Sequence, residues 1–201
     1  MVEIISALVG HLETGRHGIE RKGRGVILRE VTGRDLVQVG WWRDTGATAK
    51  QTLAKELGFA IAEGSRLVSE SGQTTVFPIA PDKVWIAAPL EAELYRKLTA
   101  SIPAEQGVAT DLGHARTVVR ISGPSARDVL ARHIAIDLDP REFPPGSFAS
   151  TAMHQTAATL HYVRDLGGDP VFDLYLTRSF ALSLFESLCA TADGFGYTLE
   201  A

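Results

Sequence analysis

The sequence predicts an α+β fold built from two similar half-domains. Short β-branched runs bounded by turn residues indicate strands, and stretches with apolar residues at helical spacing indicate helices. The order of these elements recurs at an offset of roughly eighty residues, which is too long for a solenoid and suits a duplicated half-domain. We therefore predict an irregular arm over 1–25 and a single domain over 26–201, whose halves are 26–103 and 104–201.

The arm is expected to lack regular structure because its periodicity is weak and its glycines are frequent. It carries a basic cluster formed by Arg16, His17, Arg21, Lys22 and Arg24. One interpretation of this cluster is a docking arm for an acidic surface on a partner protein, and the other is a solvated chain terminus. The sequence leaves both open.

The first half is predicted to contain strands over 26–31 and 36–42, a helix over 47–57, two strands over 74–77 and 83–87, and a helix over 91–100. Gly58 is a plausible stop for the first of these helices. Neighbouring strand residues face opposite sides, so Trp41 and Trp42 cannot both enter one core. We take Trp42 as the candidate for an edge or a contact surface; the alternative is that the chain's own arm covers it.

The second half is predicted to repeat this plan, with a strand over 116–122, a helix over 125–132, a loop over 137–147, a hairpin over 151–163, a strand over 171–176 and a helix over 178–192, capped by Thr177. Between its first strand and helix stands the break Ser122-Gly123-Pro124. A phosphate-binding turn needs free backbone N–H groups and usually a following Lys, but Pro124 removes one N–H and no Lys follows. The break therefore favours a structural turn.

Few residues suggest chemistry. Asp137 and Asp139 supply too few ligands for a calcium loop, and the histidines have no metal-ligand spacing with one another or with Cys189, which falls on an apolar helix face. We expect no catalytic residue, no cofactor-binding residue and no metal ligand in this chain. Arg116 and Arg120 lie on one face of their strand, a spacing that suits an ion-pair network, an acidic partner or a carboxylate ligand.

Composition excludes several classes of protein. With 45% hydrophobic and 22% charged residues, the 201-residue chain has the balance of a globular protein. A formal net charge of −4 argues against a nucleic-acid partner. No apolar run is long enough to span a bilayer and the first ten residues do not look like a secretory signal, so we expect no membrane contact and a cytoplasmic location.

Three blocks of the second half resemble the gamma subunit of heterotetrameric sarcosine oxidase. They are GHARTVVRISGPSAR over 113–127, DL at 137–138 followed by FPPGS over 143–147, and DPVFDLY over 169–175 followed by RSF over 178–180. The resemblance covers the chain from Gly113 to about Gly196, and the first half resembles the family mainly in its pattern.

The resemblance implies a fold similar to the folate-binding domain of glycine-cleavage aminomethyltransferases. It also implies a place in a four-subunit flavoenzyme, an oxidoreductase of sarcosine catabolism that demethylates sarcosine to glycine and gives hydrogen peroxide with formaldehyde or methylenetetrahydrofolate. In this family FAD, FMN, NAD and tetrahydrofolate belong to the alpha and beta subunits and zinc belongs to delta. The gamma subunit is non-catalytic and packs against alpha, so the expected partner contacts of this chain are Arg16, Arg21, Lys22, Arg24, Trp42, Arg116 and Arg120.

Two alternatives stay open at this point. One is a stand-alone folate-dependent one-carbon transfer protein of the aminomethyltransferase type, which rests on fold analogy and would be expected to continue beyond Ala201. The other is the gamma subunit of a related oxidase for a different N-methylated amino acid.

Overall fold

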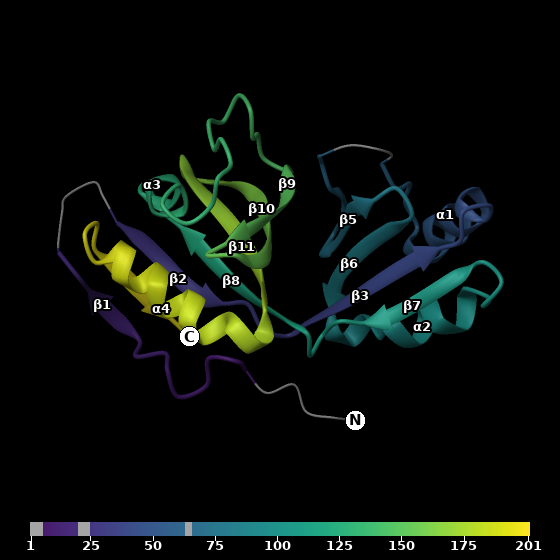
Figure 1. Cartoon of the computed structure of the whole chain (residues 1–201), viewed down its shortest axis with the longest axis horizontal. Helices are drawn as coiled ribbons and strands as arrows, with labels where there is room; N and C mark the ends of the chain where they lie inside the picture. Colours follow the sequence, from purple (N-terminus) through teal and green to yellow (C-terminus); the bar gives the residue numbers. More distant parts are fainter. Residues whose placement is uncertain (1–5, 20–24, 63–65) are drawn as a thin grey trace. The chain divides into compact units, whose positions relative to one another are not determined.

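The structure is a computed structural model of the chain, and it describes residues 6–19, 25–62 and 66–201. The chain forms two compact units. Unit 1 comprises the described residues up to Thr32 together with Ala115–Ala201, and unit 2 is Gly33–His114. Figure 1 labels their strands and helices.

Unit 2 is a five-stranded antiparallel sheet, ordered β4-β5-β6-β3-β7, with its helices packed on one face. Its elements are β3 (Arg34–Trp41), α1 (Gly46–Leu57), β4 (Ser69–Ser71), β5 (Thr74–Ala80), β6 (Lys83–Pro89), a 3-10 turn (Leu90–Ala92), α2 (Leu94–Ser101) and β7 (Gly107–Asp111). Alternate residues of β3 and β6 meet Leu53 of α1 and Leu98 of α2 in the core, because strand side chains alternate between faces.

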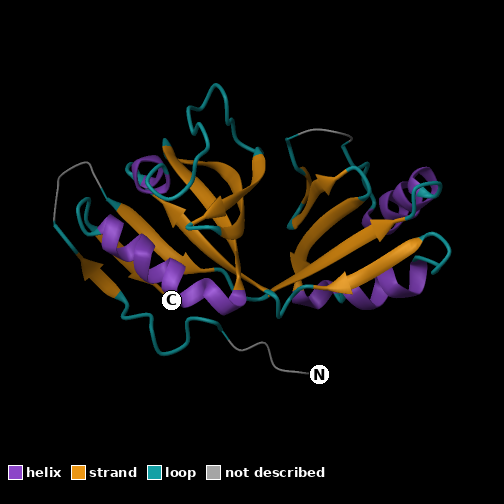
Figure 2. Cartoon of the chain, in the orientation of Figure 1, coloured by secondary structure: helices purple, strands orange, loops and turns teal. Residues whose placement is uncertain are grey.

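Unit 1 is built on a seven-stranded sheet, ordered β1-β12-β2-β8-β11-β10-β9. Its elements are β1 (Gly15–His17), β2 (Val26–Glu30), β8 (Arg116–Ser122), α3 (Ala126–Leu130), β9 (Phe148–Met153), β10 (Thr156–Leu166), β11 (Asp169–Thr177), a 3-10 turn (Arg178–Phe180), α4 (Ala181–Ala192) and β12 (Tyr197–Glu200). Figure 2 shows the two helices against the strands. Val119 and Ile121 of β8 pack with Val129 of α3 and Leu188 of α4, which defines the helix-covered face of the sheet.

The duplication predicted from the sequence is confirmed by the order of the elements. The series β3-α1-β4-β5-β6-α2-β7 of unit 2 recurs in unit 1 as β8-α3-β9-β10-β11-α4-β12. The sheets repeat as well, since β4-β5-β6-β3 corresponds to β9-β10-β11-β8. Unit 1 departs from the plan at two strands: β2 lies between β8 and β12 and pairs with β12 in parallel, and β1 pairs with the other edge of β12.

Two expectations about the early chain are wrong. The sequence places β2 in the first half because it precedes β3, but β2 pairs with β8 and β12 in the sheet of unit 1. Gly15–His17 falls in the arm expected to be irregular, yet it forms β1 and pairs with β12. Both strands are short, so their sequence pattern is weak. Their hydrogen-bond partners lie far away in the chain and cannot be inferred from the local sequence. The grouping of both units into one domain over 26–201 stays a prediction.

Element ends shift for local reasons. Gly58 ends α1 in the left-handed conformation with φ 78°, and its N–H donates to the Ala54 carbonyl, as predicted. The predicted helix over 91–100 is interrupted because Glu93 adopts φ 48°, so a 3-10 turn precedes α2. Thr177 makes no side-chain capping bond, and α4 begins only at Ala181, after a 3-10 turn. The predicted hairpin is present as β9 and β10.

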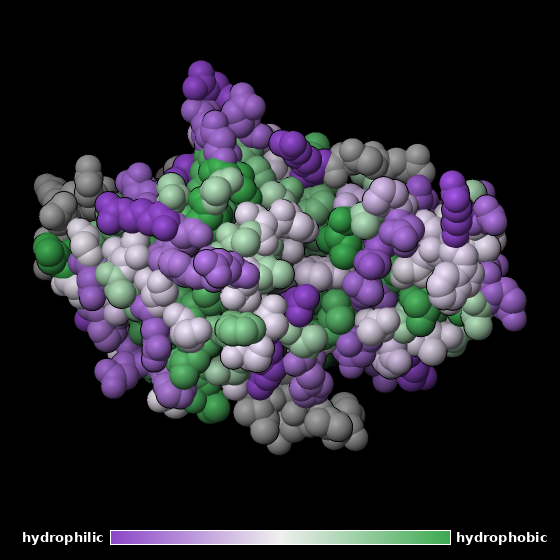
Figure 3. Space-filling view, viewed as in Figure 1, coloured by the Kyte–Doolittle hydropathy of each residue, from purple (hydrophilic) through white to green (hydrophobic). Residues whose placement is uncertain are grey.

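The exposed surface mixes polar and apolar side chains, and Figure 3 shows separate apolar patches on the visible face. None of the described helices is long and apolar enough to cross a bilayer.

Candidate functional site

Arg120 lies on the face of the unit 1 sheet that is opposite the helix-covered core. It stands between Val119 and Ile121, whose side chains enter that core, so alternation directs the guanidinium to the other face. Its cross-strand neighbour in β11 is Asp173. Arg120 Nε donates to Asp173 Oδ1 at 2.6 Å and Nη2 donates to Oδ2 at 2.7 Å, which is a bidentate ion pair.

This ion pair is almost completely removed from solvent. The Asp173 side chain is 3% exposed and the Arg120 side chain is 15% exposed. The hydrogen bonding of the Arg120 guanidinium to the Asp173 carboxylate raises the pKa of Arg120, while burial acts in the opposite direction. Of the three interpretations given for Arg120, the ion pair is the one that the structure shows; a partner contact there stays a prediction.

Asp173 is a residue that the sequence reasoning did not single out. It is buried in the middle of β11, whose neighbouring residues from Val171 to Leu176 are apolar and buried. Acidic side chains are almost never buried unless they are paired. An Asp inside an apolar strand was therefore the available signal for a buried cation partner.

Arg116 lies four residues before Arg120 and shares its face of the strand, opposite Thr177 of β11. Its Nη1 donates to the Ala115 carbonyl at 3.1 Å. Burial lowers the pKa of its guanidinium. The two arginines thus occupy the same face, as expected from their spacing, but only Arg120 has Asp173 as its ion-pair partner.

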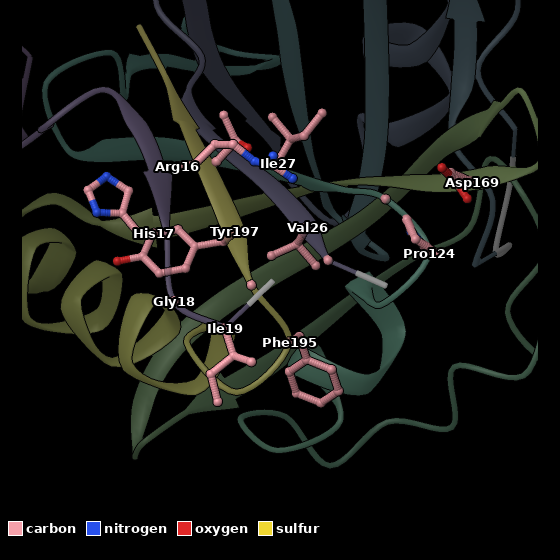
Figure 4. A pocket seen from close by; sticks show the side chains of 14 residues that line it. Arg16, His17, Gly18, Ile19, Val26, Ile27, Pro124, Asp169, Phe195 and Tyr197 are labelled. Atoms are coloured by element: carbon pink, nitrogen blue, oxygen red, sulfur yellow. The ribbon is translucent and has the colours of Figure 1, made fainter. Parts of the chain in front are cut away.

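Arg16 lines a pocket of about 340 Å³ in unit 1. The pocket lies where β1, β12 and β2 meet the turn between β8 and α3, and Figure 4 shows the labelled side chains around it. Its wall combines Arg16 and Asp169 with apolar side chains such as Val26 and Phe195. Beside it the His17 ring stacks on Tyr197, with centroids 5.0 Å apart. Arg21, Lys22 and Arg24 lie outside the described residues.

The turn Ser122-Gly123-Pro124 has the architectural role that the sequence favoured. Gly123 has φ +110°, and a Cβ there would lie 2.9 Å from the Gly25 carbonyl oxygen. The Ser125 N–H donates to that same carbonyl. The turn is therefore hydrogen-bonded to Gly25, the residue before β2, and the close packing leaves no room for a side chain at position 123.

The two adjacent tryptophans of unit 2 divide as alternation requires. Trp41 is 7% exposed in the core, and Lys50 Nζ lies 5.7 Å from its ring centroid. Trp42 is 51% exposed, and its Nε1–H donates to the Ala104 carbonyl at 2.8 Å. Val108 of β7, 49% exposed, pairs with Gly40, and Trp42 N donates to the Gln106 carbonyl, so both side chains lie at one end of the β3/β7 pair. We call these two residues the Trp42–Val108 patch.

Cys189 packs partly buried against the core of unit 1. Burial raises the pKa of its thiol to about 11. The pKa of the neighbouring Tyr197 is also raised, to about 12, again by burial first. A thiol in this environment suits packing and not nucleophilic chemistry.

Acidic side chains do not assemble a metal centre in the described part of the chain, which contains no group of three or more His, Cys, Asp and Glu residues suited to hold an ion. Asp137 and Asp139 instead make local interactions within their loop. The Asp139 N–H donates to Asp137 Oδ1, and Asp139 pairs with the exposed Arg141.

Comparisons with known proteins place this chain among subunits of one enzyme. The model of the sarcosine oxidase gamma subunit family matches residues 43–192. Sarcosine oxidase subunit gamma of Corynebacterium sp. (strain U-96) is 30% identical over 145 residues, which are 71% of this chain and 70% of that protein. The Arthrobacter sp. subunit gamma is 33% identical over 119 residues, 59% of this chain and 58% of that protein.

Solved structures agree in fold. A chain of heterotetrameric sarcosine oxidase from Corynebacterium sp. U-96, in complex with pyrrole 2-carboxylate, superposes with a TM-score of 0.78 and 24% identity, covering 89% of this chain and 88% of that one. Aminomethyltransferase T of the glycine cleavage system from Bartonella henselae gives a TM-score of 0.61 at 15% identity, covering 88% of this chain and 48% of that one. These likenesses show the fold that the resemblance implied. On the extent of the family match, the chain belongs to the sarcosine oxidase gamma subunit family.

Proposed function

We propose that this chain is the structural, non-catalytic gamma subunit of a heterotetrameric sarcosine oxidase. The complex oxidatively demethylates sarcosine to glycine and releases hydrogen peroxide, with formaldehyde or methylenetetrahydrofolate as the one-carbon product. The observation that carries this proposal is the family match over 43–192, supported by a relative that is 30% identical over 71% of the chain.

The partners and cofactors follow from membership in such a complex. The alpha subunit is the expected direct contact, and the beta and delta subunits belong to the same assembly. FAD, FMN, NAD and tetrahydrofolate are assigned to alpha and beta, zinc is assigned to delta, and the complex works in the cytoplasm.

Among the expected contact residues, Trp42 has the strongest structural support. It is 51% exposed, and the neighbouring Val108 adds a second exposed apolar side chain. Tryptophans that bind a partner are often the residues whose removal weakens an interface most. Arg16, which lines the pocket of unit 1, and Arg116, which is half-buried, are weaker candidates because Arg16 has interactions within the chain and Arg116 hydrogen-bonds its own backbone.

Co-purification tests this proposal. A tagged chain co-expressed with alpha, beta and delta subunits of a related oxidase should recover all four chains and sarcosine-dependent hydrogen peroxide formation. The chain alone should form no peroxide from sarcosine. A monodisperse chain that oxidises sarcosine without partners would overturn the non-catalytic assignment.

A matched pair of variants tests the contact surface. Trp42→Ala should weaken the affinity for alpha about 30-fold, the loss expected for an interface hot spot of about 2 kcal/mol, and should lower the recovery of alpha accordingly. Tyr95→Ala, which removes an aromatic side chain 40% exposed on α2 of the same unit, serves as control and should leave recovery unchanged. Equal recovery with both variants would remove Trp42 from the interface.

A further inference from the structure

One pair of counterpart strands differs between the two units. Strand β12 of unit 1 occupies the place in the repeated series that β7 occupies in unit 2. Both edges of β12 are paired, one with β2 and the other with β1, which runs antiparallel to it. In the described part of the chain β7 pairs with β3 alone and forms one end of its sheet (Figure 1). The same place in the fold is therefore covered by an added strand in unit 1 and open in unit 2.

The hydrogen bonds at the two ends of the β3/β7 pair show which backbone groups of β7 face outward. The Gln106 carbonyl accepts from the Trp42 N–H, and the Leu112 N–H donates to the Leu36 carbonyl. In an antiparallel pair, residues that bond across the ladder alternate with residues whose N–H and C=O point away from it. The even-numbered positions from 106 to 112 therefore face β3, and the odd-numbered positions face outward.

The outward groups form a short edge with the spacing that a strand requires. Ala109 and Asp111 each direct an N–H and a C=O away from β3. The Gly107 carbonyl points the same way, while the Gly107 N–H donates to the Pro103 carbonyl. Rows of backbone groups on a sheet edge pair with extended segments of other chains, which is known as β-augmentation. An added antiparallel strand would exchange hydrogen bonds with Ala109 and Asp111.

The edge of β7 lacks the features that usually protect a free edge. Proteins block such edges with lysine, proline, bulges or very short strands. Strand β4, at the other end of the same sheet, has only three residues, and its central residue is Glu70. Strand β7 has five residues without lysine or proline, and its one charge is Asp111 at its end. The exposed Val108 belongs to this strand, so the edge is continuous with the Trp42–Val108 patch.

The charges at the end of β7 indicate which kind of segment fits. Burial, and after it the negative charge of Asp111, raises the pKa of Asp35, although hydrogen bonding from the Tyr95 N–H acts in the opposite direction. Two carboxylates that repel each other are both stabilised by a nearby cation. A segment with lysine or arginine next to Asp111 is therefore favoured over an acidic segment.

We propose that an extended segment of a partner subunit pairs antiparallel with the free edge of β7 and adds a strand to the sheet of unit 2. The direction follows the pairing of β1 with β12 in unit 1. The segment places an apolar side chain opposite Val108, in a non-hydrogen-bonded pair where side chains lie closest, and a lysine or arginine next to Asp111. This inference rests on the proposed function, because its occupant comes from the subunits of that complex.

Amide hydrogen exchange at residue resolution tests the pairing. The full chain is measured alone and in the complex obtained by co-expression with alpha, beta and delta subunits of a related oxidase. The Ala109 and Asp111 amides should exchange freely in the chain alone and about a hundredfold more slowly in the complex, because each then donates to the added strand.

The free edge of β9 in unit 1 provides a matched control. The Tyr162 N–H donates to the Ser147 carbonyl, so alternation along β9 directs the Ser150 N–H away from β10. Strand β4, the counterpart of β9, also ends its sheet, so the repeated plan gives no reason to expect an added strand there. The Ser150 amide should exchange freely in the chain alone and in the complex.

Proline variants test the contribution of the edge to binding. Proline at an outward edge position removes that N–H and leaves the chain's own ladder intact. Ala109→Pro should lower the affinity for the partner about tenfold, because a hydrogen bond is lost and the ring obstructs the added strand. Ser150→Pro should leave it unchanged, and Asp111→Lys should weaken it by repulsion. Competition with the differently tagged original chain during co-expression measures these ratios, and far-UV circular dichroism verifies that each variant is folded.

Several results would overturn the inference. If the four chains assemble while the Ala109 amide still exchanges freely, strand addition is wrong and the proposed function stands. If that amide is already slow in the chain alone, this chain or a second copy covers the edge, and size-exclusion chromatography shows which. If Ala109→Pro is folded and competes as well as the original chain, the edge does not bind; if Asp111→Lys does, the basic character of the segment is wrong. If Ala109→Pro does not fold, the exchange rates of the original chain decide. Failure of the four chains to assemble would reject the proposed function and this inference with it.

Discussion

Replacing Arg120 by methionine should destabilise unit 1 strongly, because Arg120 is the ion-pair partner of a buried carboxylate. Methionine keeps much of the side-chain volume but leaves the Asp173 carboxylate, 3% exposed, without its two hydrogen bonds of 2.6 and 2.7 Å. Removing one partner of a buried pair typically costs about 3–5 kcal/mol, because an uncompensated charge remains in a poorly solvated place. We expect Arg120→Met to lie in that range.

The reverse change and the double change separate the two contributions. Asp173→Leu should cost less than Arg120→Met, because the guanidinium, 15% exposed, can turn its charge toward water on a long stem. The double variant Arg120→Met/Asp173→Leu should return to within about 1 kcal/mol of the original stability, since apolar replacements of buried pairs are often neutral. The cycle thus isolates the coupling between the two side chains.

Urea unfolding followed by far-UV circular dichroism measures these differences. Tryptophan fluorescence is unsuitable for unit 1, because all three tryptophans, Trp41, Trp42 and Trp85, belong to unit 2. Arg141→Met is the matched control: its ion pair with Asp139 is exposed to solvent, so stability should not change measurably. If both single variants at the buried pair cost less than about 1 kcal/mol and their effects add, the pair is solvated and our reasoning is refuted.

Three further predictions concern unit 1. Thr117→Val should raise the unfolding free energy by up to about 1 kcal/mol, because the buried Thr117 Oγ1 has no hydrogen-bond partner among the described residues; a loss of stability in urea unfolding would show a missed partner. Gly123→Ala should cost about 2 kcal/mol through its φ of +110° and its contact with the Gly25 carbonyl, whereas Gly167→Ala, with open space around it, should cost less in the same assay. Burial favours the neutral thiol of Cys189 and raises its pKa to about 11, so iodoacetamide at pH 8 should alkylate it about a hundredfold more slowly in the native chain than in urea. Equal rates in both states would contradict that burial.

Secondary structure could be predicted from the sequence where the local hydrophobic pattern matches the environment that each residue has in the fold. The run over 116–122 is a strand with those bounds in the structure, because its alternation already separates a core face from a polar face. The duplication was also visible, since each half repeats the same series of strand and helix signals. Glycine at position 58 marked a helix end by its tolerance of positive φ.

Contacts between residues that are far apart in the chain could not be predicted from the sequence. Nothing near β2 indicates that it pairs with β8 and β12, so its adjacency to β3 was misleading. The ion pair of Arg120 with Asp173 joins strands far apart in the chain, and the contact of His133 with His154 depends on a hairpin turn with strained residues. Spacing rules find ligands on one helix or loop, and they do not detect side chains that meet only after a sheet has formed.

The position of β2 also bears on how the chain folds during its synthesis. Unit 2 is continuous in sequence, so all of its strands are available once residue 114 has left the ribosome. Strand β2 is made before unit 2, but its parallel neighbour β12, Tyr197–Glu200, is made after unit 2. Contacts between distant segments form slowly because a long loop must close first. We therefore expect unit 2 to form first, while one edge of β2 stays unpaired until the residues of β12 have been made.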